Sequence, residues 1–380
     1  MLVVGIPKEI KPLERRVALT PSAVRHLCQE GVRVVVQKDA GRESGFRDPD
    51  YSASGAQIAT DAESLYAKAR LIQKVKEPLA PEFLLLRREH VLFSFLHLAS
   101  PEQCELVRAL RKAGLTALAY ETLEVEGKLP VLAPMSEIAG SLAALYAAFF
   151  KRQNFLTDSK INYPSDFFRD LEAIAKAYPS SPDWEIGRVL IFGGGVAGQK
   201  AADYALRLKG RVSVVEKNSQ RREALKNQYG SKLEILNLEE DLHPRLEAAE
   251  VLIGCVHRAG QRAEPVVSAS LLERASAKRK KIIIDISIDQ GGNFPESHST
   301  PYVDPLYLDS FGNVRFGVSN IPSLCGRPAS EALARATLPY TLALAKDGEG
   351  ALRKLPELLR AVNVQGGEIK IEAIRQAHRL

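Results

Sequence analysis

Cysteine is scarce in this chain, with only four residues among 380, and these stand at least 70 positions apart: Cys28, Cys104, Cys255 and Cys325. That spacing supports neither a zinc site nor a redox pair, so we expect reduced thiols, no bound metal and a cytoplasmic protein. No apolar run approaches the roughly 20 residues needed to span a bilayer. Residues 1–9 have the pattern of a first strand rather than of a signal peptide. No membrane partner is therefore expected.

The excess of positive charge is also small: 52 basic against 46 acidic residues give a net charge of +6 and a pI near 9.0. The densest basic run, Lys278 to Lys281, lies between a predicted helix at 269–277 and an apolar strand. Cations complement the dipole at the end of a helix. No aromatic residue interleaves the run, as base stacking would require. We therefore expect a solvated turn and no nucleic-acid partner.

The length of 380 residues predicts two or three globular domains. Short apolar runs alternate with helix-length amphipathic stretches, which predicts parallel α/β structure. In the first part of the chain, strands are predicted at 2–6, 32–37, 71–75, 91–96 and 115–120. Thr20 and Pro21 open a predicted helix that Gly31 closes. Further helices are predicted at 101–113, where Gly114 follows, and at 136–150.

A second α/β unit is predicted from Arg188 onward. Its strands are expected at 189–192, 211–215, 251–255 and 281–286, and its helices at 196–208 and 220–229. The connection before it, 151–186, contains no glycine and one helix-like stretch at 165–178. We predict that this connection forms a subunit or domain surface and takes no part in the chemistry.

The sequence GGGVAG at 193–198 matches the G-x-G-x-x-G pattern of dinucleotide-binding turns. Alone the pattern is weak, but here it follows a strand and opens a helix rich in small residues. Gly193 permits the tight turn, Gly195 lets the backbone approach a pyrophosphate, and Gly198 permits close packing of helix on strand. The helix N-terminus at Val196 and Ala197 then offers N–H groups to the phosphates.

Glu216 ends the next strand, eighteen residues after Gly198, where a carboxylate accepts hydrogen bonds from the ribose hydroxyls. A carboxylate there also repels the 2′-phosphate of NADP, so NAD is the expected cofactor. Lys217, Arg221 and Arg222 lie close by and leave some tolerance of NADP open. The alternative explanation is a structural turn followed by a surface glutamate.

Charged residues stand at strand ends outside the nucleotide signature. Arg16 precedes a helix, Lys76 ends a strand stopped by a proline, and His97 ends an apolar strand. Ligands bind beyond the carboxyl ends of parallel strands. Each residue alone has a plain structural explanation, but together with Asp289, which follows the strand predicted near 282–288, they predict a site for a small anionic substrate facing a nicotinamide.

Longer motifs run through most of the chain: GIPKE at 5–9, RVALTP at 16–21, KVKEP at 74–78, FLHLA at 95–99, AYET at 119–122, LAPMSE at 132–137, DISIDQGG at 285–292, VSNIP at 318–322 and ATLPY at 336–340. With these motifs the sequence resembles the family of alanine dehydrogenases and nicotinamide nucleotide transhydrogenases. The resemblance implies two Rossmann-like, doubly wound domains. A substrate domain of residues 1–130 and 326–380 holds an inserted NAD-binding domain, 131–325, with an insertion at about 151–187.

The resemblance also implies a function: oxidative deamination of L-alanine to pyruvate and ammonia with NAD, by a cytoplasmic homo-oligomer, a hexamer or a dimer. It implies that Arg16 and Lys76 hold the substrate carboxylate. His97 is implied as general acid and base, and Asp289 assists proton and ammonia transfer. Met135 and Asn320 are implied to line the pocket, while Ser136, Val256 and Asp289 join the glycine-rich turn at the cofactor.

Three other functions compete with this one. The first is an NAD(H)-binding subunit of a transhydrogenase, which has no amino-acid substrate. The second is a related amino-acid or opine-type dehydrogenase, such as the saccharopine-forming type, with a larger pocket. The third is a non-catalytic NAD-binding regulator, against which the set Arg16, Lys76, His97 and Asp289 argues.

Overall fold

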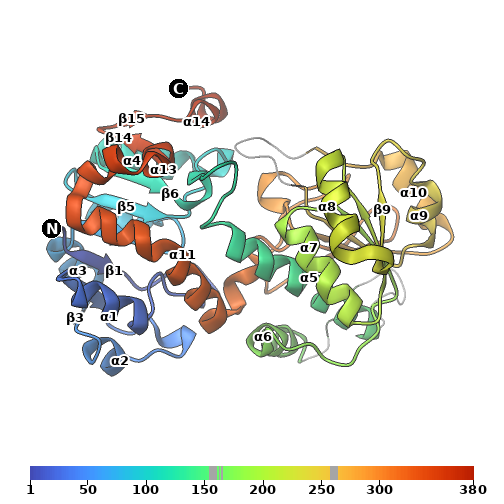
Figure 1. The fold of residues 1–380 in the computed structure, drawn as a ribbon, viewed down its shortest axis with the longest axis horizontal. Helices are drawn as coiled ribbons and strands as arrows, with labels where there is room; N and C mark the ends of the chain where they lie inside the picture. The colour runs from blue at the N-terminus through green and yellow to red at the C-terminus, as the bar shows by residue number, and fades with distance from the viewer. Residues whose placement is uncertain (154–160, 162, 164–165, 257–263) are drawn as a thin grey trace. The chain divides into compact units, whose positions relative to one another are not determined.

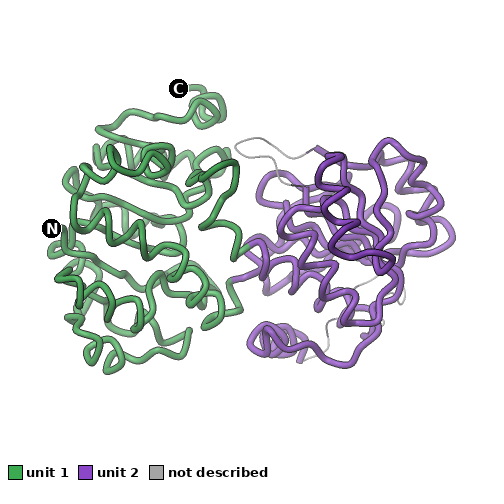
Figure 2. Tube along the Cα trace, viewed as in Figure 1, with its two compact units in different colours: residues 1–135, 323–380 green, residues 136–322 purple. Residues whose placement is uncertain are grey.

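The computed structural model describes residues 1–153, 161, 163, 166–256 and 264–380. They form two compact units, shown in different colours in Figure 2: unit 1 comprises residues 1–135 and 323–380, and unit 2 comprises residues 136–322. Each unit contains one mostly parallel sheet with helices packed on it (Figure 1). The predicted α/β fold with two doubly wound sheets is therefore confirmed.

The sheet of unit 1 has the strand order β15-β14-β6-β5-β4-β1-β2-β3. The first six strands, all parallel, are β1 (Val4–Ile6), β2 (Val34–Gln37), β3 (Gln57–Ala59), β4 (Leu71–Gln73), β5 (Val91–Ser94) and β6 (Thr116–Ala119). The last two, β14 (Val362–Gln365) and β15 (Glu368–Ile369), join antiparallel at the β6 edge. Because parallel strands run in one direction, the loops after β1, β4, β5 and β6 all leave the sheet at the same end.

The predicted helices of unit 1 are present, with their expected capping residues. Thr20 accepts a hydrogen bond from the Ala23 amide at the start of α1 (Pro21–Gln29), and Gly31 follows with a φ of +79°. Gly114, with a φ of +69°, ends α4 (Cys104–Ala113). Pro101 begins a short 3₁₀ turn that precedes α4, where a continuous helix was expected. Shorter helices of unit 1 are α2 (Asp48–Ser52), α12 (Ala351–Lys354), α13 (Pro356–Ala361) and α14 (Glu372–His378).

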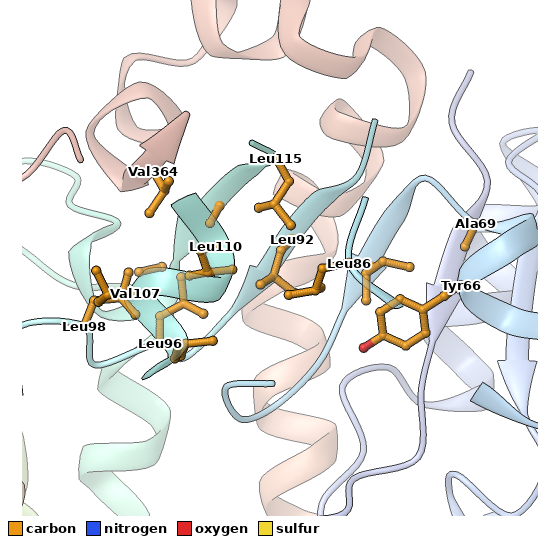
Figure 3. Close-up of a cluster of buried hydrophobic side chains, with 14 of the residues drawn as sticks. Tyr66, Ala69, Leu86, Leu92, Leu96, Leu98, Val107, Leu110, Leu115 and Val364 are labelled. Atoms are coloured by element: carbon orange, nitrogen blue, oxygen red, sulfur yellow. The ribbon is translucent and has the colours of Figure 1, made fainter. Parts of the chain in front are cut away.

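Two layers of helix cover the sheet of unit 1. On one face, α3 (Ala62–Lys68) and α4 bury Leu65, Tyr66, Val107 and Leu110 against strand residues such as Leu92 (Figure 3). On the other face lie α1 and the long helix α11 (Gly326–Asp347), which comes from the end of the chain (Figure 1). Burial of this apolar surface is the main force that holds the strands, and the loops at their ends, in place.

The sheet of unit 2 has the order β12-β13-β11-β10-β7-β8-β9. Its strands are β7 (Arg188–Phe192), β8 (Arg211–Val215), β9 (Leu233–Leu236), β10 (Val251–Gly254), β11 (Ile282–Asp285), β12 (Leu306–Leu308) and β13 (Val314–Phe316), of which only β12 is antiparallel. Helices α7 (Val196–Arg207), α8 (Ser219–Tyr229), α9 (His243–Ala248) and α10 (Ala269–Ala277) connect the strands. The strand order reverses between β7 and β10, the place where such sheets bind nucleotides.

Helix α5 (Ala133–Gln153) is longer than the predicted 136–150. By length and composition it is apolar enough to cross a membrane, contrary to the sequence-based expectation that no such segment exists. However, 78% of its most apolar window is buried inside the protein, as in the core helix of a folded domain. Phe149 and Phe150 of this helix pack on Phe167 of α6 (Phe167–Ala177). Helix α6 belongs to the segment 151–186, of which residues 154–160, 162 and 164–165 lie outside the described residues.

The basic run after α10 is not wholly solvated, which corrects the expectation for its last member. Lys281 is fully buried, and its Nζ donates hydrogen bonds to the carbonyl oxygens of Glu247 and Ala249 at 2.9 and 2.8 Å. Burial lowers the pKa of this lysine to about 8. Lys281 thus donates hydrogen bonds to carbonyl oxygens left without partners at the end of α9. Its role is structural, whereas the sequence predicted a solvated turn.

Candidate active site

The loops that leave the sheet of unit 1 carry the residues that the sequence singled out. Arg16 follows β1, Lys76 follows β4 and His97 follows β5, three strands that lie side by side. Arg16 and Lys76 are buried, with 3% and 5% of their surface exposed, and His97 is partly buried. Charged groups with so little exposure require partners. The structure provides a carboxylate for each of the two cations.

Glu14 holds Arg16 by one edge of its guanidinium group. The Arg16 Nε lies 2.7 Å from Glu14 Oε1, and Nη2 lies 2.5 Å from Oε2. The remaining terminal nitrogen, Nη1, lies 3.2 Å from the Met135 sulfur. Burial alone would lower the pKa of Arg16, but Glu14 outweighs it and raises the pKa. The guanidinium is therefore kept charged, with its Nη1 side next to Met135.

Glu77 pairs with Lys76 and with a second lysine. Its Oε2 lies 3.6 Å from the Lys76 Nζ, and its Oε1 lies 2.6 Å from the Lys11 Nζ. Burial opposes ionisation of Glu77, yet Lys76, Lys11 and His97 together lower its pKa to about 2. Because this carboxylate is influenced by both Lys76 and His97, the two predicted site residues lie in one electrostatic environment.

His97 has a backbone conformation that side chains seldom adopt, with a φ of +50°. Its ring is nearly parallel to that of Phe95, with centroids 5.8 Å apart. Its amide donates a hydrogen bond of 2.6 Å to Oε1 of Glu121, which follows β6. Unusual backbone conformations of this kind concentrate at functional sites.

Below these loops lies a buried ionic cluster centred on Lys74, which is fully buried. Its Nζ lies 2.9 Å from Glu82 Oε1 and 3.2 Å from Glu9 Oε2. Glu9 also accepts a hydrogen bond of 2.7 Å from the Val75 amide, so the cluster anchors the segment that carries Lys76. Burial raises the pKa of Glu9 to about 7, and the attraction of Lys74 only partly opposes this because Glu14 and Glu82 add negative charge nearby.

The raised pKa of Glu9 predicts a loss of stability as the pH rises towards neutrality. The carboxyl group titrates near its ordinary value of 4.5 in the unfolded chain and near 7 in the folded one, so the folded state holds the extra proton between these values. The free energy of unfolding should fall by up to about 3 kcal/mol between pH 5 and pH 8 from this group alone. Glu9→Gln should flatten this slope, as urea unfolding at several pH values will measure. Equal slopes in both proteins would contradict the assignment.

In unit 2, the glycine-rich turn joins β7 to α7 in the predicted way. Gly193 has a φ of +96°, and a Cβ there would come within 2.9 Å of the Cys255 carbonyl oxygen. A Cβ on Gly198 would overlap the Gly193 carbonyl oxygen at 1.8 Å. A Cβ on Gly195, by contrast, would meet no described protein atom within 4 Å. The space above Gly195, at the N-terminus of a twelve-residue helix, suits the close approach of a pyrophosphate.

Glu216 directly follows β8, and its carboxylate is turned towards the glycine-rich turn. Its Oε2 accepts a hydrogen bond of 2.9 Å from the Gly194 amide and lies 3.2 Å from Nη1 of Arg221. Its Oε1 accepts a hydrogen bond of 2.8 Å from the Asn218 amide. Arg222 instead donates to the backbone carbonyl oxygens of residues 216 and 217. These contacts fix the carboxylate in one orientation beside the glycine-rich turn.

The other predicted residues of unit 2 are spread over separate elements. Asp289 is exposed on a 3₁₀ turn after β11, Asn320 has a φ of +67°, and Ser136 lies in the first turns of α5. Val256 follows β10, and Asn293 holds it on both sides: the Val256 amide donates to Asn293 Oδ1, and Asn293 Nδ2 donates to the Val256 carbonyl. The residues that follow Val256, 257–263, lie outside the described residues.

Sequence reasoning did not identify the carboxylates that organise unit 1. Glu14, Glu77 and Glu121 each contact a predicted site residue, and Asn293 does so in unit 2. Their positions in the sequence could have indicated them. Glu14 and Glu77 are near neighbours of Arg16 and Lys76, and Glu121 follows the next parallel strand. Within the described residues, no group of three potential metal ligands is found.

Two doubly wound sheets, one with a glycine-rich dinucleotide turn and one with buried cations at its strand ends, define a dinucleotide-binding α/β protein of the dehydrogenase class. Comparison with family models is specific: residues 5–139 match the N-terminal domain, and residues 173–372 the C-terminal domain, of the alanine dehydrogenase/PNT family. The chain belongs to this family, and the resemblance stated from the sequence is confirmed.

Relatives match over nearly the whole chain. The alanine dehydrogenase of Halomonas elongata is 35% identical over 98% of this chain and 96% of its own length, and that of Bacillus subtilis is 35% identical over 98% and 94%. A solved L-alanine dehydrogenase superposes with a TM-score of 0.85 at 36% identity, covering 99% of each chain. A transhydrogenase from Sinorhizobium meliloti, with a TM-score of 0.74 and 21% identity over 98% of this chain and 99% of its own, shares the fold.

Proposed function

We propose that this protein is an NAD-dependent alanine dehydrogenase, which converts L-alanine, NAD⁺ and water to pyruvate, ammonium, NADH and a proton. The observation that carries the proposal is the whole-length similarity to alanine dehydrogenases at 35 to 36% identity. It is supported by the buried cations Arg16 and Lys76, which suit a small carboxylate substrate.

In the proposed reaction, Arg16 and Lys76 bind the substrate carboxylate, with Met135 beside it and Asn320 lining the pocket. Glu14 keeps the guanidinium of Arg16 in one orientation, so the side chain loses little conformational entropy when the substrate binds. His97 acts as general base towards the water molecule that attacks the imino carbon and returns the proton to the departing ammonia. Asp289 assists this proton and ammonia transfer.

The cofactor, when bound, supplies the hydride acceptor. We propose that Gly193, Gly195 and Gly198, with the first amides of α7 at Val196 and Ala197, hold its pyrophosphate. Glu216 would hold the ribose, and Ser136, Val256 and Asp289 would contact the rest of the molecule. The open space at Gly195 supports this placement, since no described protein atom occupies it.

The direct test is to follow NADH formation at alkaline pH with a panel of L-amino acids. We expect L-alanine to give the highest turnover. If none reacts while hydride passes to a second nucleotide-binding protein, the transhydrogenase hypothesis replaces ours. If instead NADH is consumed when a 2-oxo acid and a larger amino acid are supplied together, the opine-type hypothesis does. If neither reaction occurs although NAD binds, the protein is a non-catalytic regulator.

NAD should bind at least about tenfold more tightly than NADP, because Glu216 accepts a hydrogen bond from the ribose and repels a 2′-phosphate. Arg222 is engaged with backbone carbonyls, which leaves Lys217, which is exposed, and Arg221, whose side chain is half exposed, as nearby cations able to favour NADP. Calorimetric titration of both cofactors will measure the ratio. Glu216→Gln should reduce it, and Arg221→Ala should increase it. Equal or tighter binding of NADP by the unaltered protein would contradict the prediction.

We further propose, from the family resemblance, that the protein is a cytoplasmic homo-oligomer, a hexamer or a dimer. The segment 151–186 is proposed to contribute to a subunit or domain surface. Light scattering will give the assembly size. Replacement of the segment by a short linker should change that size and leave NAD binding intact.

A further inference from the structure

The conformation of His97 needs support from its surroundings. A φ of +50° places this residue in the left-handed region, which costs a residue other than glycine about 1 kcal/mol or more. The residue stands just beyond β5, where the ladder with the neighbouring strands has ended: the last pair in register with β6 is Ser94 with Ala119. The amides of Leu96 and His97 therefore need acceptors outside the sheet.

Glu121 provides these acceptors. Its Oε1 accepts the His97 amide at 2.6 Å, and the Leu96 amide lies 3.3 Å from both carboxylate oxygens. Glu121 belongs to a 3₁₀ turn, Tyr120–Thr122, that follows β6 directly, and β6 is paired with β5. A carboxylate from one strand end thus binds two successive amides at the neighbouring strand end. Hydrogen bonds to an ionised acceptor are among the stronger ones in proteins.

We propose that Glu121 is a positioning residue, which holds the backbone at Leu96 and His97 so that the imidazole of His97 is kept in its working orientation. The proposal rests on the proposed function, because it takes His97 as the general acid and base. Burial raises the pKa of Glu121, while the two amide hydrogen bonds and Lys76 favour its ionised form. A glutamine at this position would keep one acceptor oxygen, lose the negative charge and put an NH₂ group in place of the second oxygen.

The kinetic test compares three variants in the oxidation of L-alanine: Glu121→Ala, Glu121→Gln and, as a matched control, Glu124→Gln, whose side chain is exposed on the same stretch of chain. We expect kcat to fall by about tenfold to a hundredfold in Glu121→Ala, and by less in Glu121→Gln, because one acceptor is kept. The KM for NAD should stay within about twofold in both, since no cofactor contact changes. Unchanged kcat in a folded Glu121→Ala protein would overturn the proposal.

A double-mutant cycle distinguishes positioning from general damage. If Glu121 acts through His97, Glu121→Gln should reduce kcat by less than about twofold in a His97→Asn background, although it reduces kcat severalfold in the presence of His97. The same reduction in both backgrounds would show that Glu121 supports the structure at large, and would refute a specific effect on His97.

A measurement that needs no turnover keeps this inference separate from the proposed function. The chain contains seven histidines, and the ¹⁵N resonances of the His97 ring are identified by their loss in His97→Asn. Glu121→Gln should shift these resonances, and Glu124→Gln should leave them in place. If the unaltered protein oxidises no amino acid, the proposed function fails, and this spectrum alone decides on Glu121: unshifted His97 resonances reject the positioning role.

Discussion

Replacement of Lys76 by methionine should lower kcat/KM for L-alanine by about one to two orders of magnitude and leave NADH affinity within a few-fold of the unaltered protein. Methionine keeps the length and the apolar stem of the side chain but removes the charge. Loss of one charge-assisted hydrogen bond to the substrate carboxylate costs about 1.5 to 3 kcal/mol. The glycine-rich turn and Glu216 belong to unit 2 and are untouched, so substrate and cofactor binding should separate.

Steady-state kinetics and a fluorescence titration of NADH measure the two quantities in parallel. Lys68→Met, at an exposed position on α3, is the matched control and should change neither of them. Because Lys76 lies 3.6 Å from Glu77, the variant also removes a neighbouring charge from that carboxylate, but Lys11 remains paired with it. Full turnover in Lys76→Met would show that Lys76 does not bind the substrate.

Replacement of Lys74 by methionine should destabilise the protein by about 3 to 5 kcal/mol at pH 8. The substitution leaves Glu9 and Glu82, whose side chains are only 4% and 5% exposed, facing each other without the ammonium group between them. Two buried carboxylates without a counter-ion are far more costly than the pair that Lys74 completes. The loss should be smaller at pH 5.5, because Glu9, with a pKa near 7, can then take up a proton.

Urea unfolding followed by circular dichroism will measure the effect of Lys74→Met. Lys112→Met, exposed on α4, should change the free energy of unfolding by less than about 0.5 kcal/mol. The triple variant with Glu9→Gln and Glu82→Gln should recover part of the loss, because the carboxylates then carry no charge. A loss below 1 kcal/mol in Lys74→Met would mean that water or a rearrangement satisfies the two acids.

Much of the fold follows from local sequence pattern. Helix α10 and strand β8 have the predicted bounds, and most of the other predicted elements are displaced by only a few residues. The strands β4 and β5 end two residues earlier than predicted, at Gln73 and Ser94. The two segments stay hydrogen-bonded for one more step, from the Lys74 amide to Phe93 and from the Phe95 amide to Val75. Lys76 and His97 then lie beyond the sheet. Apolar pattern alone does not show where pairing stops.

The candidate site could be predicted in part, for a physical reason. Cations and histidine at strand ends are visible because strand ends can be located, and the glycine-rich turn has a fixed local geometry. The partnership of Glu121 with the His97 amide depends on which strands are neighbours and on a left-handed residue, neither of which the sequence displays. The burial of Lys281 likewise depends on the position of α9, which was not predicted.

The position of β14 has a consequence for how the chain is made. Val362 of β14 pairs with Leu118 of β6, and all of unit 2 lies between them in the sequence. The amide of Val17 and the side chain of Gln73 have buried partners on α11, which is also synthesised late. During synthesis, every strand of the unit 2 sheet is therefore made before β14 and α11. Until these are made, β6 is an open sheet edge and the polar groups of Val17 and Gln73 lack their partners. Interrupted synthesis at this stage would release a protein with an exposed strand edge, a known route to aggregation.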